Sequence, residues 1–117
     1  MLKTSELVAI QFIKGLDEKD LPEIRLFRNN DGKKGKALYL FSNPTTITVK
    51  NLDLIQKMYL VDEEGELSTK KIDLTISDNN ITEVKSTYNW NSEEEFARYM
   101  RFANRYAKSL IFNKQKN

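Results

Sequence analysis

Four carboxylates lie within one short segment, residues 62–66: Asp62, Glu63, Glu64 and Glu66. Clustered carboxylate oxygens are ligands that hard cations such as calcium prefer. However, the segment lacks the alternating D-x-D-x-D-G spacing of a calcium loop, and hydrolysis by paired carboxylates requires two such groups at a defined separation in a cleft. A tight turn provides no cleft, so we expect a solvated hairpin tip without a metal site.

The sequence contains no cysteine and no histidine. Thiolate nucleophiles, disulfides and cysteine metal sites are therefore excluded, and the commonest acid–base side chain and zinc ligand is missing. Gly32 and Gly35 belong to no GxxxxGK[ST] phosphate-binding loop, and we interpret them as turn residues. We expect a protein without catalytic activity, metal or cofactor.

Basic residues gather in residues 25–36, with aromatic residues within or beside them. The basic residues are Arg25, Arg28, Lys33, Lys34 and Lys36. Basic groups interleaved with aromatic side chains suit single-stranded nucleic acid. Strand alternation, however, places Tyr39 and Phe41 on one face, and packing in a core is the ordinary use of large apolar residues. A small nucleic-acid-binding β domain that uses this hairpin remains the alternative function.

Three arginines, Arg98, Arg101 and Arg105, recur at intervals of three and four residues. This spacing places them on one outer face of a predicted helix. A charged outer face is ordinary for a surface helix. Three arginines without interleaved acids also suit an electrostatic docking strip, so both interpretations stay open.

The helix that carries these arginines is predicted from residues 90–112, where apolar residues recur with helical spacing. They are Phe96, Tyr99, Met100, Ala103, Tyr106, Ala107, Leu110 and Ile111. Ser92 followed by Glu95 has the form of a capping box, so the helix should begin at Ser92 and end near residue 112. We expect residues 113–117 to fray. The apolar stripe needs a sheet to pack against.

Strands are predicted within residues 6–90, where apolar or alternating segments are separated by turn residues. The segments are residues 7–13, 23–28, 37–41, 55–61, 67–76 and 81–90. Ile24 and Leu26 should face inward, and residues 37–41, apolar on both faces, should form a central strand covered on each side. Hairpins are expected at residues 29–35 and 78–80. Residues 45–52 form either an edge strand or an ordered loop.

The composition fits one domain, residues 1–117. With 39% hydrophobic and 31% charged residues the chain is neither disordered nor membrane-spanning, and its net charge of +2 does not by itself indicate nucleic acid. The first residues lack the features of a signal or transit peptide. The predicted fold is α+β: a mainly antiparallel sheet of about six strands, sandwich-like or partly open, with the C-terminal helix packed on it.

Four features of the chain resemble one known family: residues 10–41, MYLVDEEGEL at residues 58–67, SEEEFARYMRFANRYA at residues 92–107, and their order. The most specific are the MYL-x-DEEGE turn, which contains Tyr59, and the E-x-x-R-[FY]-M-R-F-x-x-R-Y helix. Together they resemble the photosystem II assembly-factor family of small soluble peripheral reaction-centre proteins, the W-type proteins.

The resemblance implies an antiparallel β fold with a C-terminal helix, no catalytic activity and no cofactor. It also implies peripheral binding to photosystem II assembly intermediates on the cytosolic or stromal face of the thylakoid membrane, in cyanobacteria or plastids. The implied partners are core antenna and reaction-centre subunits, held partly by β-sheet extension, with no nucleic acid and no transmembrane segment. The expected partner-binding residues are Arg25, Arg28, Tyr59, Asp62, Glu63, Glu64, Glu66, Arg98, Arg101 and Arg105.

Overall fold

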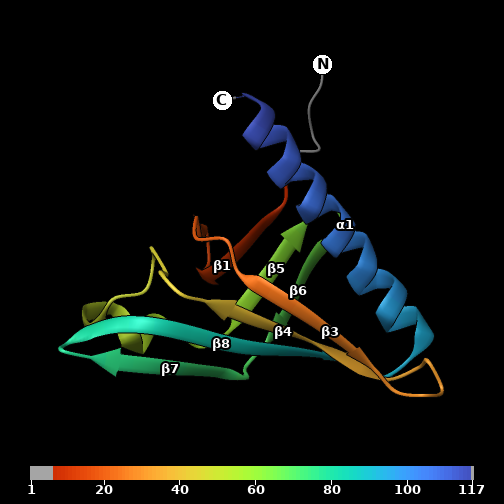
Figure 1. The fold of residues 1–117 in the computed structure, drawn as a ribbon, viewed down its shortest axis with the longest axis horizontal. Coiled ribbons are helices and arrows are strands. Elements are labelled where there is room, and N and C mark those ends of the chain that lie inside the picture. The colour runs from red at the N-terminus through yellow and green to blue at the C-terminus, as the bar shows by residue number, and fades with distance from the viewer. Residues whose placement is uncertain (1–6, 117) are drawn as a thin grey trace.

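The computed structural model describes the backbone of residues 7–116 and the side chains of residues 7–111. These residues form two four-stranded antiparallel sheets and one long C-terminal helix (Figure 1). The predicted α+β class, with antiparallel strands followed by a helix, is confirmed. The described part of the chain contains eight strands in two sheets, compared with about six expected in a sandwich-like or partly open arrangement. Residues 6 and 117, the ends of the predicted strand region and tail, lie outside the described residues.

The first sheet has the strand order β2-β1-β5-β6. Its strands are β1 Ala9–Ile13, β2 Leu16–Asp17, β5 Met58–Asp62 and β6 Gly65–Thr69. Alternation in β1 buries Ile10 and Phe12, as the sequence predicts. The short strand β2 was not expected. It forms because Gly15, with a φ of 86°, reverses the chain and brings Leu16 opposite Ile13.

The second sheet has the order β3-β4-β8-β7. Its strands are β3 Glu23–Arg28, β4 Gly35–Phe41, β8 Asn80–Trp90 and β7 Ile72–Ser77. The prediction of one strand over residues 67–76 is wrong, because the chain leaves the first sheet after Thr69 and enters the second at Ile72. Two bonds to β8 fix this crossing: Thr69 Oγ1 donates to the Thr87 carbonyl at 2.7 Å, and Ser86 Oγ donates to the Lys71 carbonyl at 2.9 Å.

Both predicted hairpins of the second sheet are present. Gly32 adopts a φ of 73° in the β3–β4 turn. The β7–β8 turn has two central residues, Asp78 and Asn79, with φ of 53° and 65°. Two left-handed residues in a two-residue turn are the mark of type I′, whose twist matches that of the strands.

Residues 45–48 form an ordered loop that leads into the 3₁₀ helix η2, Val49–Leu54, so the edge-strand alternative for residues 45–52 is wrong. The buried side chain of Glu18 holds this loop in place. Its oxygens accept hydrogen bonds from the backbone N–H and the hydroxyl of both Thr45 and Thr46, at 2.6–3.0 Å. Burial raises the pKa of Glu18, but these bonds outweigh it and lower the pKa overall.

Strand β3 differs from the prediction, because all six of its residues are exposed. Ile24 and Leu26 pair with Tyr39 and Ala37 and so share the core-facing side of the sheet. They remain 37% and 46% exposed, because no described element covers the outermost strand. The expectation that β4 is buried on both sides is also wrong: Ala37, Tyr39 and Phe41 are buried, whereas the opposite face is only partly covered.

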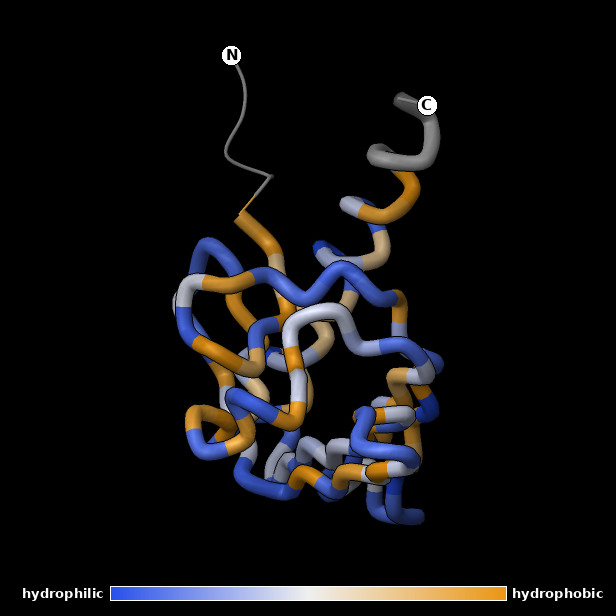
Figure 2. Tube along the Cα trace, turned by 90° about the vertical axis from the view of Figure 1, so that its left-hand side faces the viewer, coloured by the Kyte–Doolittle hydropathy of each residue, from blue (hydrophilic) through white to orange (hydrophobic). Residues whose placement is uncertain are grey.

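Helix α1, Glu93–Lys116, lies across both sheets (Figure 1). Ser92 Oγ accepts from the Glu95 N–H at 3.1 Å, which confirms the predicted N-cap, while the Glu95 carboxylate accepts from the Asn91 N–H at 2.8 Å. The C-terminal part rises beyond the sheets (Figures 1 and 2). Its backbone is helical to Lys116, so the helix extends past the expected end near residue 112.

The buried stripe of α1 is rotated from the predicted one. Phe102, absent from the prediction, is fully buried beside Tyr99 and Tyr106, whereas Ala107 and Ile111 are exposed. Tyr99 stacks on Trp90 at 5.2 Å between ring centroids, and its hydroxyl lies 2.7 Å from that of Tyr39. Aromatic pairs of this kind add specific geometry to the hydrophobic burial that holds the helix on the sheets.

Candidate partner-binding surface

The acidic β5–β6 turn and the arginines of α1 meet in the structure. Asp62, at the end of β5, has a side chain that is 0% exposed. Arg98 donates to it through Nη2 to Oδ1 at 2.8 Å and through Nη1 to Oδ2 at 3.0 Å. Arg105 Nη1 also donates to Oδ2 at 2.9 Å. Burial opposes ionisation of Asp62, but the bonds from Arg98 and Arg105 outweigh it and lower its pKa.

Glu64 is the second carboxylate of this cluster. Arg101 donates to it through Nε at 2.7 Å and Nη2 at 2.9 Å, and Arg105 Nη1 donates at 2.6 Å. The two bonds from Arg101, followed by the bond from Arg105, lower the pKa of Glu64 to about 2. We call Asp62, Glu64, Arg98, Arg101 and Arg105 the ion-pair cluster.

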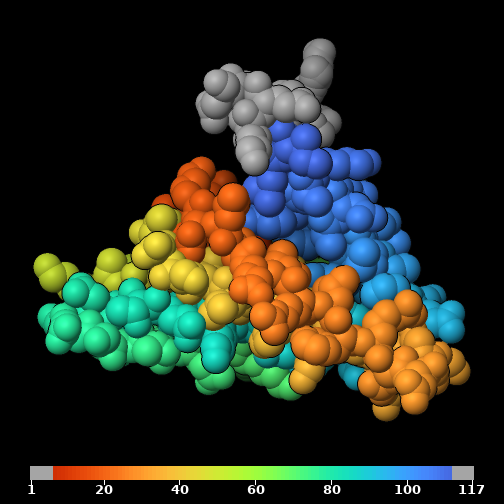
Figure 3. Space-filling view, viewed as in Figure 1, coloured from red at the N-terminus to blue at the C-terminus, as the bar shows by residue number. Residues whose placement is uncertain are grey.

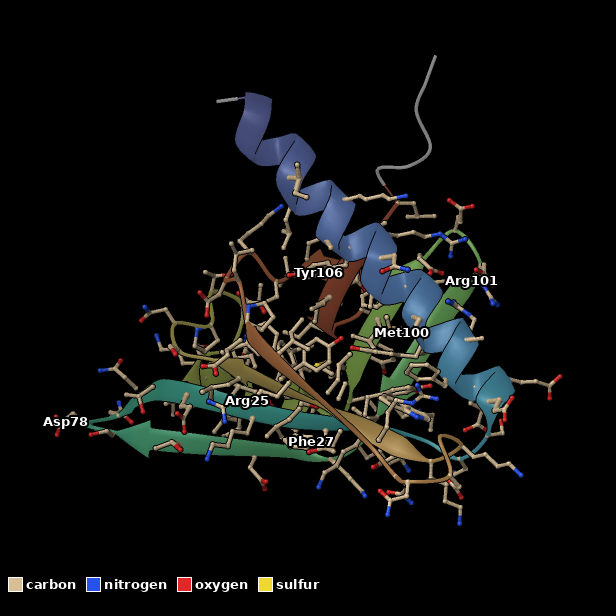
Figure 4. The ribbon with its side chains drawn as sticks, turned by 45° about the vertical axis from the view of Figure 1, so that its right-hand side comes forward. Arg25, Phe27, Asp78, Met100, Arg101 and Tyr106 are labelled. Atoms are coloured by element: carbon tan, nitrogen blue, oxygen red, sulfur yellow. The ribbon has the colours of Figure 1, made fainter. Side chains whose placement is uncertain are left out.

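The ion-pair cluster corrects two predictions. The acidic turn is not a solvated hairpin tip at Asp62 and Glu64, because both carboxylates bind arginines. Nor do all three arginines form a free docking strip: the side chains of Arg98 and Arg105 are only 19% and 27% exposed and point to the turn. Arg101 remains half-exposed at the side of the helix (Figure 4).

The remaining predicted residues of the turn are more open. Glu63 is exposed and lies 3.7 Å from Arg105 Nη2. Glu66 pairs with Lys14 at 3.4 Å, and the same ammonium lies 5.3 Å from the centroid of the Tyr59 ring. These weak contacts leave Glu63, Glu66 and Tyr59 accessible to a partner.

Arg25 and Arg28 lie on the other sheet, on β3. Arg25 is exposed and pairs with Glu23 at 2.8 Å. Arg28 packs on Phe96 of α1, with 4.0 Å from its guanidinium carbon to the ring centroid, and donates to the Gly32 carbonyl. Arg28 therefore ties its own hairpin to the start of the helix.

The aromatic platform that a nucleic-acid binder needs is not formed on this hairpin. Tyr39 and Phe41 are fully buried in the core. Phe27 is the exposed member of the three, close to Arg25 on β3 (Figure 4). A single exposed ring does not make the series of stacking surfaces that single-stranded nucleic acid uses.

The free edge of β3 is the most accessible pairing surface of the second sheet. Its pairing with β4 runs from Glu23 to Arg28 without a shift in register, and no described strand pairs with its other side. The ladder that joins the opposite edge strand, β7, to β8 is irregular between Thr75 and Ile76, where β8 has one additional residue. An additional residue of this kind bends a sheet and increases its local twist, and the β3–β4 ladder has none. Figure 3 shows the β3–β4 hairpin open on the surface, in orange.

The described residues contain no group of three or more acidic side chains placed to hold a metal ion. Within residues 7–116, no helix is long and apolar enough to cross a membrane.

Comparison with known proteins places this architecture in a family. The family model described as "Psb28 protein" matches residues 10–112, which include both sheets and nearly all of α1. The chain belongs to the Psb28 family. The relatives in this family that resemble the chain are named "Photosystem II reaction center Psb28 protein". The resemblance seen in the sequence is thereby confirmed at the level of the family.

The Psb28 relatives match over most of the chain. The protein of Prochlorococcus marinus strain NATL2A is 67% identical over 113 residues, covering 97% of this chain and 100% of the relative. That of Acaryochloris marina strain MBIC 11017 is 45% identical over 101 residues, covering 86% and 90%. That of Synechococcus sp. strain WH7803 is 42% identical over 101 residues, covering 86% and 78%.

Sequence reasoning missed two residues that position these surfaces. Glu18 looked like part of an acidic connection, and only the fold shows that it fastens the loop of residues 45–48. Phe102 lies off the predicted stripe, yet it is fully buried, with its ring centroid 6.5 Å from that of Tyr99 and 5.8 Å from that of Tyr106. Tyr99, Phe102 and Tyr106 are spaced by three and four residues. Giving large aromatic side chains more weight in the helical periodicity would have placed Phe102 in the buried stripe.

Proposed function

We propose that this protein is a non-catalytic assembly factor that binds peripherally to photosystem II assembly intermediates, and that the partner adds a strand to the free edge of β3. The single observation that carries the mode of binding is the regular, exposed and unprotected edge of β3 beside half-exposed Ile24, Leu26 and Phe27. The association with photosystem II is supported by the names of the relatives.

Strand addition explains both affinity and selectivity. Main-chain hydrogen bonds to a free edge supply affinity for any extended segment. Ile24 and Leu26 lie on one side of the sheet and Phe27 on the other, so apolar side chains of the added strand find contacts on both sides. Covering these three exposed apolar residues favours binding by roughly 25 cal/mol of free energy for each Å² of apolar surface removed from water.

The partners in this proposal are core antenna and reaction-centre subunits of photosystem II, reached from the cytosolic or stromal side of the thylakoid membrane. A peripheral contact is consistent with a chain whose described helix does not span a membrane. The ion-pair cluster acts in this scheme as an internal brace. Arg25, Glu63 and Glu66 remain as charges that steer orientation.

The experiment is a pull-down from detergent-solubilised thylakoid membranes with the tagged protein, followed by mass spectrometry. Leu26→Lys places a charge on the β3 edge, and edge lysines oppose strand addition. Ile76→Lys makes the same change at a half-exposed residue of β7 and serves as the matched control. Circular dichroism and thermal unfolding establish that both variants are folded.

The wild type and Ile76→Lys should capture photosystem II core antenna and reaction-centre subunits, and Leu26→Lys should capture them at least about tenfold less, the equivalent of ~1.4 kcal/mol. A wild type that captures no photosystem II subunit contradicts the function. If Leu26→Lys and Ile76→Lys capture these subunits equally well, the proposed function is retained but β3 is not the edge that pairs with the partner.

A further inference from the structure

A groove of 530 Å³ opens on the outer face of the second sheet, at the end that carries the β3–β4 turn. Phe27, Lys36 and Asn89 line it from three adjacent strands, and Lys36 pairs across the strands with both of the others. Cross-strand partners share one face of a sheet, so these side chains lie together opposite the core. We call this the basic groove.

The charge of the basic groove is uncompensated. Lys34, Lys36 and Lys71 come from the turn, from β4 and from the crossing between the sheets, and the lining contains no Asp or Glu. None of these three lysines forms an ion pair with a carboxylate of the described residues. Three converging ammonium groups without counter-ions raise the local potential and favour an anionic occupant.

The rest of the same face is charge-balanced. Arg25 is paired with Glu23, and Asp73 of β7 lies directly opposite Lys85 of β8. Opposite charges facing across strands offset one another. The unpaired positive charge of this face thus lies at the groove.

The uncharged lining favours a peptide. Asn29, Asn89 and Asn91 contribute amide groups that donate to and accept from peptide groups. The exposed ring of Phe27 adds an apolar wall, with Lys36 Nζ 5.7 Å from its centroid. Trp90 also lines the groove, and its buried Nε1 has no hydrogen-bond partner among the described residues.

Two other anionic partners fit less well. Single-stranded nucleic acid needs successive stacking rings, and Tyr39 and Phe41 are buried on the opposite face of the sheet. An anionic membrane surface needs a broad cationic face, whereas the same face of the sheet also carries Glu23 and Asp73.

We propose that the basic groove is a docking site for a short acidic segment of a protein partner, whose carboxylates bind Lys34, Lys36 and Lys71 and whose apolar side chain packs on Phe27. This contact lies on the face of the sheet and does not use the main chain of the β3 edge. It therefore adds a second, charge-selective contact to the proposed function. The groove and the strand addition at β3 are tested independently of each other.

The test measures binding of a fluorescein-labelled peptide of glutamates interspersed with leucine, by fluorescence anisotropy at low salt. A peptide with glutamine in place of every glutamate is the uncharged control. The test variant is Lys36→Glu/Lys71→Glu. The matched control is Lys50→Glu/Lys108→Glu, which makes the same change in net charge at two exposed lysines outside the groove.

We expect the acidic peptide to bind the wild type and Lys50→Glu/Lys108→Glu alike, and Lys36→Glu/Lys71→Glu at least about tenfold more weakly, with binding that declines as salt rises. The glutamine peptide should bind no variant. Equal loss in both double variants shows a net-charge effect and overturns the proposal, as does absence of binding to the wild type.

Two further probes decide the class of partner. The probes are a labelled single-stranded oligonucleotide and vesicles with anionic headgroups. If either binds the wild type more tightly than the acidic peptide does, and loses binding in Lys36→Glu/Lys71→Glu, the groove is a site for that ligand. This result overturns the proposal of an acidic peptide. The pull-down from thylakoid membranes remains an independent measurement. If the pull-down captures no photosystem II subunit while the acidic peptide still binds, the proposed function is contradicted and the groove remains a peptide-binding site.

Discussion

Arg98 of α1 and Asp62 of β5 form a two-pronged ion pair, with Nη2–Oδ1 at 2.8 Å and Nη1–Oδ2 at 3.0 Å, in which the carboxylate is completely buried. The two parallel bonds fix both distance and orientation between the guanidinium and the carboxylate. Arg105 donates to the same Oδ2, about two helical turns further along α1. Two points of attachment determine how the helix lies against the β5–β6 turn.

Removing the shared carboxylate should therefore loosen the helix. Asp62→Asn is expected to lower the free energy of unfolding by ~3–5 kcal/mol, because it leaves Arg98 and Arg105 without their buried counter-ion. Urea denaturation measures this loss. Glu63→Gln, at the neighbouring exposed carboxylate, should change stability by less than about 0.5 kcal/mol. A comparable loss in the two variants would mean that the buried pair does not brace the helix.

The ion-pair cluster also predicts how stability depends on pH. The pKa of Glu64 is lowered from 4.5 to about 2, and that of Asp62 is lowered as well. Because the folded protein holds these protons less tightly than the unfolded chain, the stabilisation is fully present above pH 4.5 and is lost as the pH falls toward 2. Unfolding followed across this range should show it.

Glu64→Gln isolates one contribution to this pH dependence. The stability difference between wild type and Glu64→Gln should be largest above pH 4.5 and should shrink steadily toward pH 2, where wild-type Glu64 becomes protonated. A difference that stays constant over this range would show that the Glu64 carboxylate does not titrate with a lowered pKa.

The sequence predicted the elements better than the contacts between them. The capping signal at Ser92, the alternation in β1 and the Asn, Asp and Gly turns are local, so their geometry could be inferred residue by residue. The pairing of Asp62 with Arg98 joins residues 36 positions apart, and nothing local distinguishes it from a solvated turn beside a solvated helix face.

Strand β3 shows the same limit. Alternation correctly predicted that Ile24 and Leu26 share the core-facing side, but burial depends on what covers a strand. The crossing at Lys70 and Lys71 splits the expected long strand between two sheets, and the order β3-β4-β8-β7 leaves β3 at an edge of the second one. Strand order depends on contacts between residues far apart in the chain, so it could not be predicted from local sequence patterns.

The two buried tyrosine hydroxyls provide a third prediction. Tyr39 and Tyr99 are hydrogen-bonded at 2.7 Å, and burial raises the pKa of both, that of Tyr99 to about 12. Tyr99→Phe should cost ~1–3 kcal/mol, because it leaves the Tyr39 hydroxyl buried without this partner. The double variant Tyr39→Phe/Tyr99→Phe removes both polar groups and should recover part of the loss. A double-mutant cycle with additive losses would contradict the coupling.

The rotation of the helix stripe gives a fourth prediction. Phe102 is fully buried, whereas Met100 is only partly buried, on the side of α1 seen in Figure 4. Phe102→Ala should cost ~3–5 kcal/mol in denaturant unfolding, since it opens a cavity in the aromatic core. Met100→Ala should cost clearly less. The reverse order would place the buried stripe where the sequence first indicated it.

The last prediction concerns steering at the β3 edge and rests on the proposed function. Charge reversal of Arg98 or Arg105 does not test docking alone, because it also breaks the ion-pair cluster that braces the helix. Arg25 is the suitable residue: its side chain is exposed, and its contact with Glu23 is a surface pair of little energetic value. Arg25→Glu should leave the unfolding free energy within about 0.5 kcal/mol of wild type.

If the edge of β3 receives the partner, Arg25→Glu should slow capture of photosystem II intermediates at low salt and approach the wild-type rate as salt screens the charge, because rim charges act chiefly on association. Lys50→Glu, an exposed reversal in the 3₁₀ helix away from β3, controls for net charge. Time-resolved binding to immobilised intermediates measures both. An Arg25→Glu rate equal to that of Lys50→Glu at every salt concentration would mean that the partner does not approach along β3, since a charge on that strand cannot then lie at the rim of the contact.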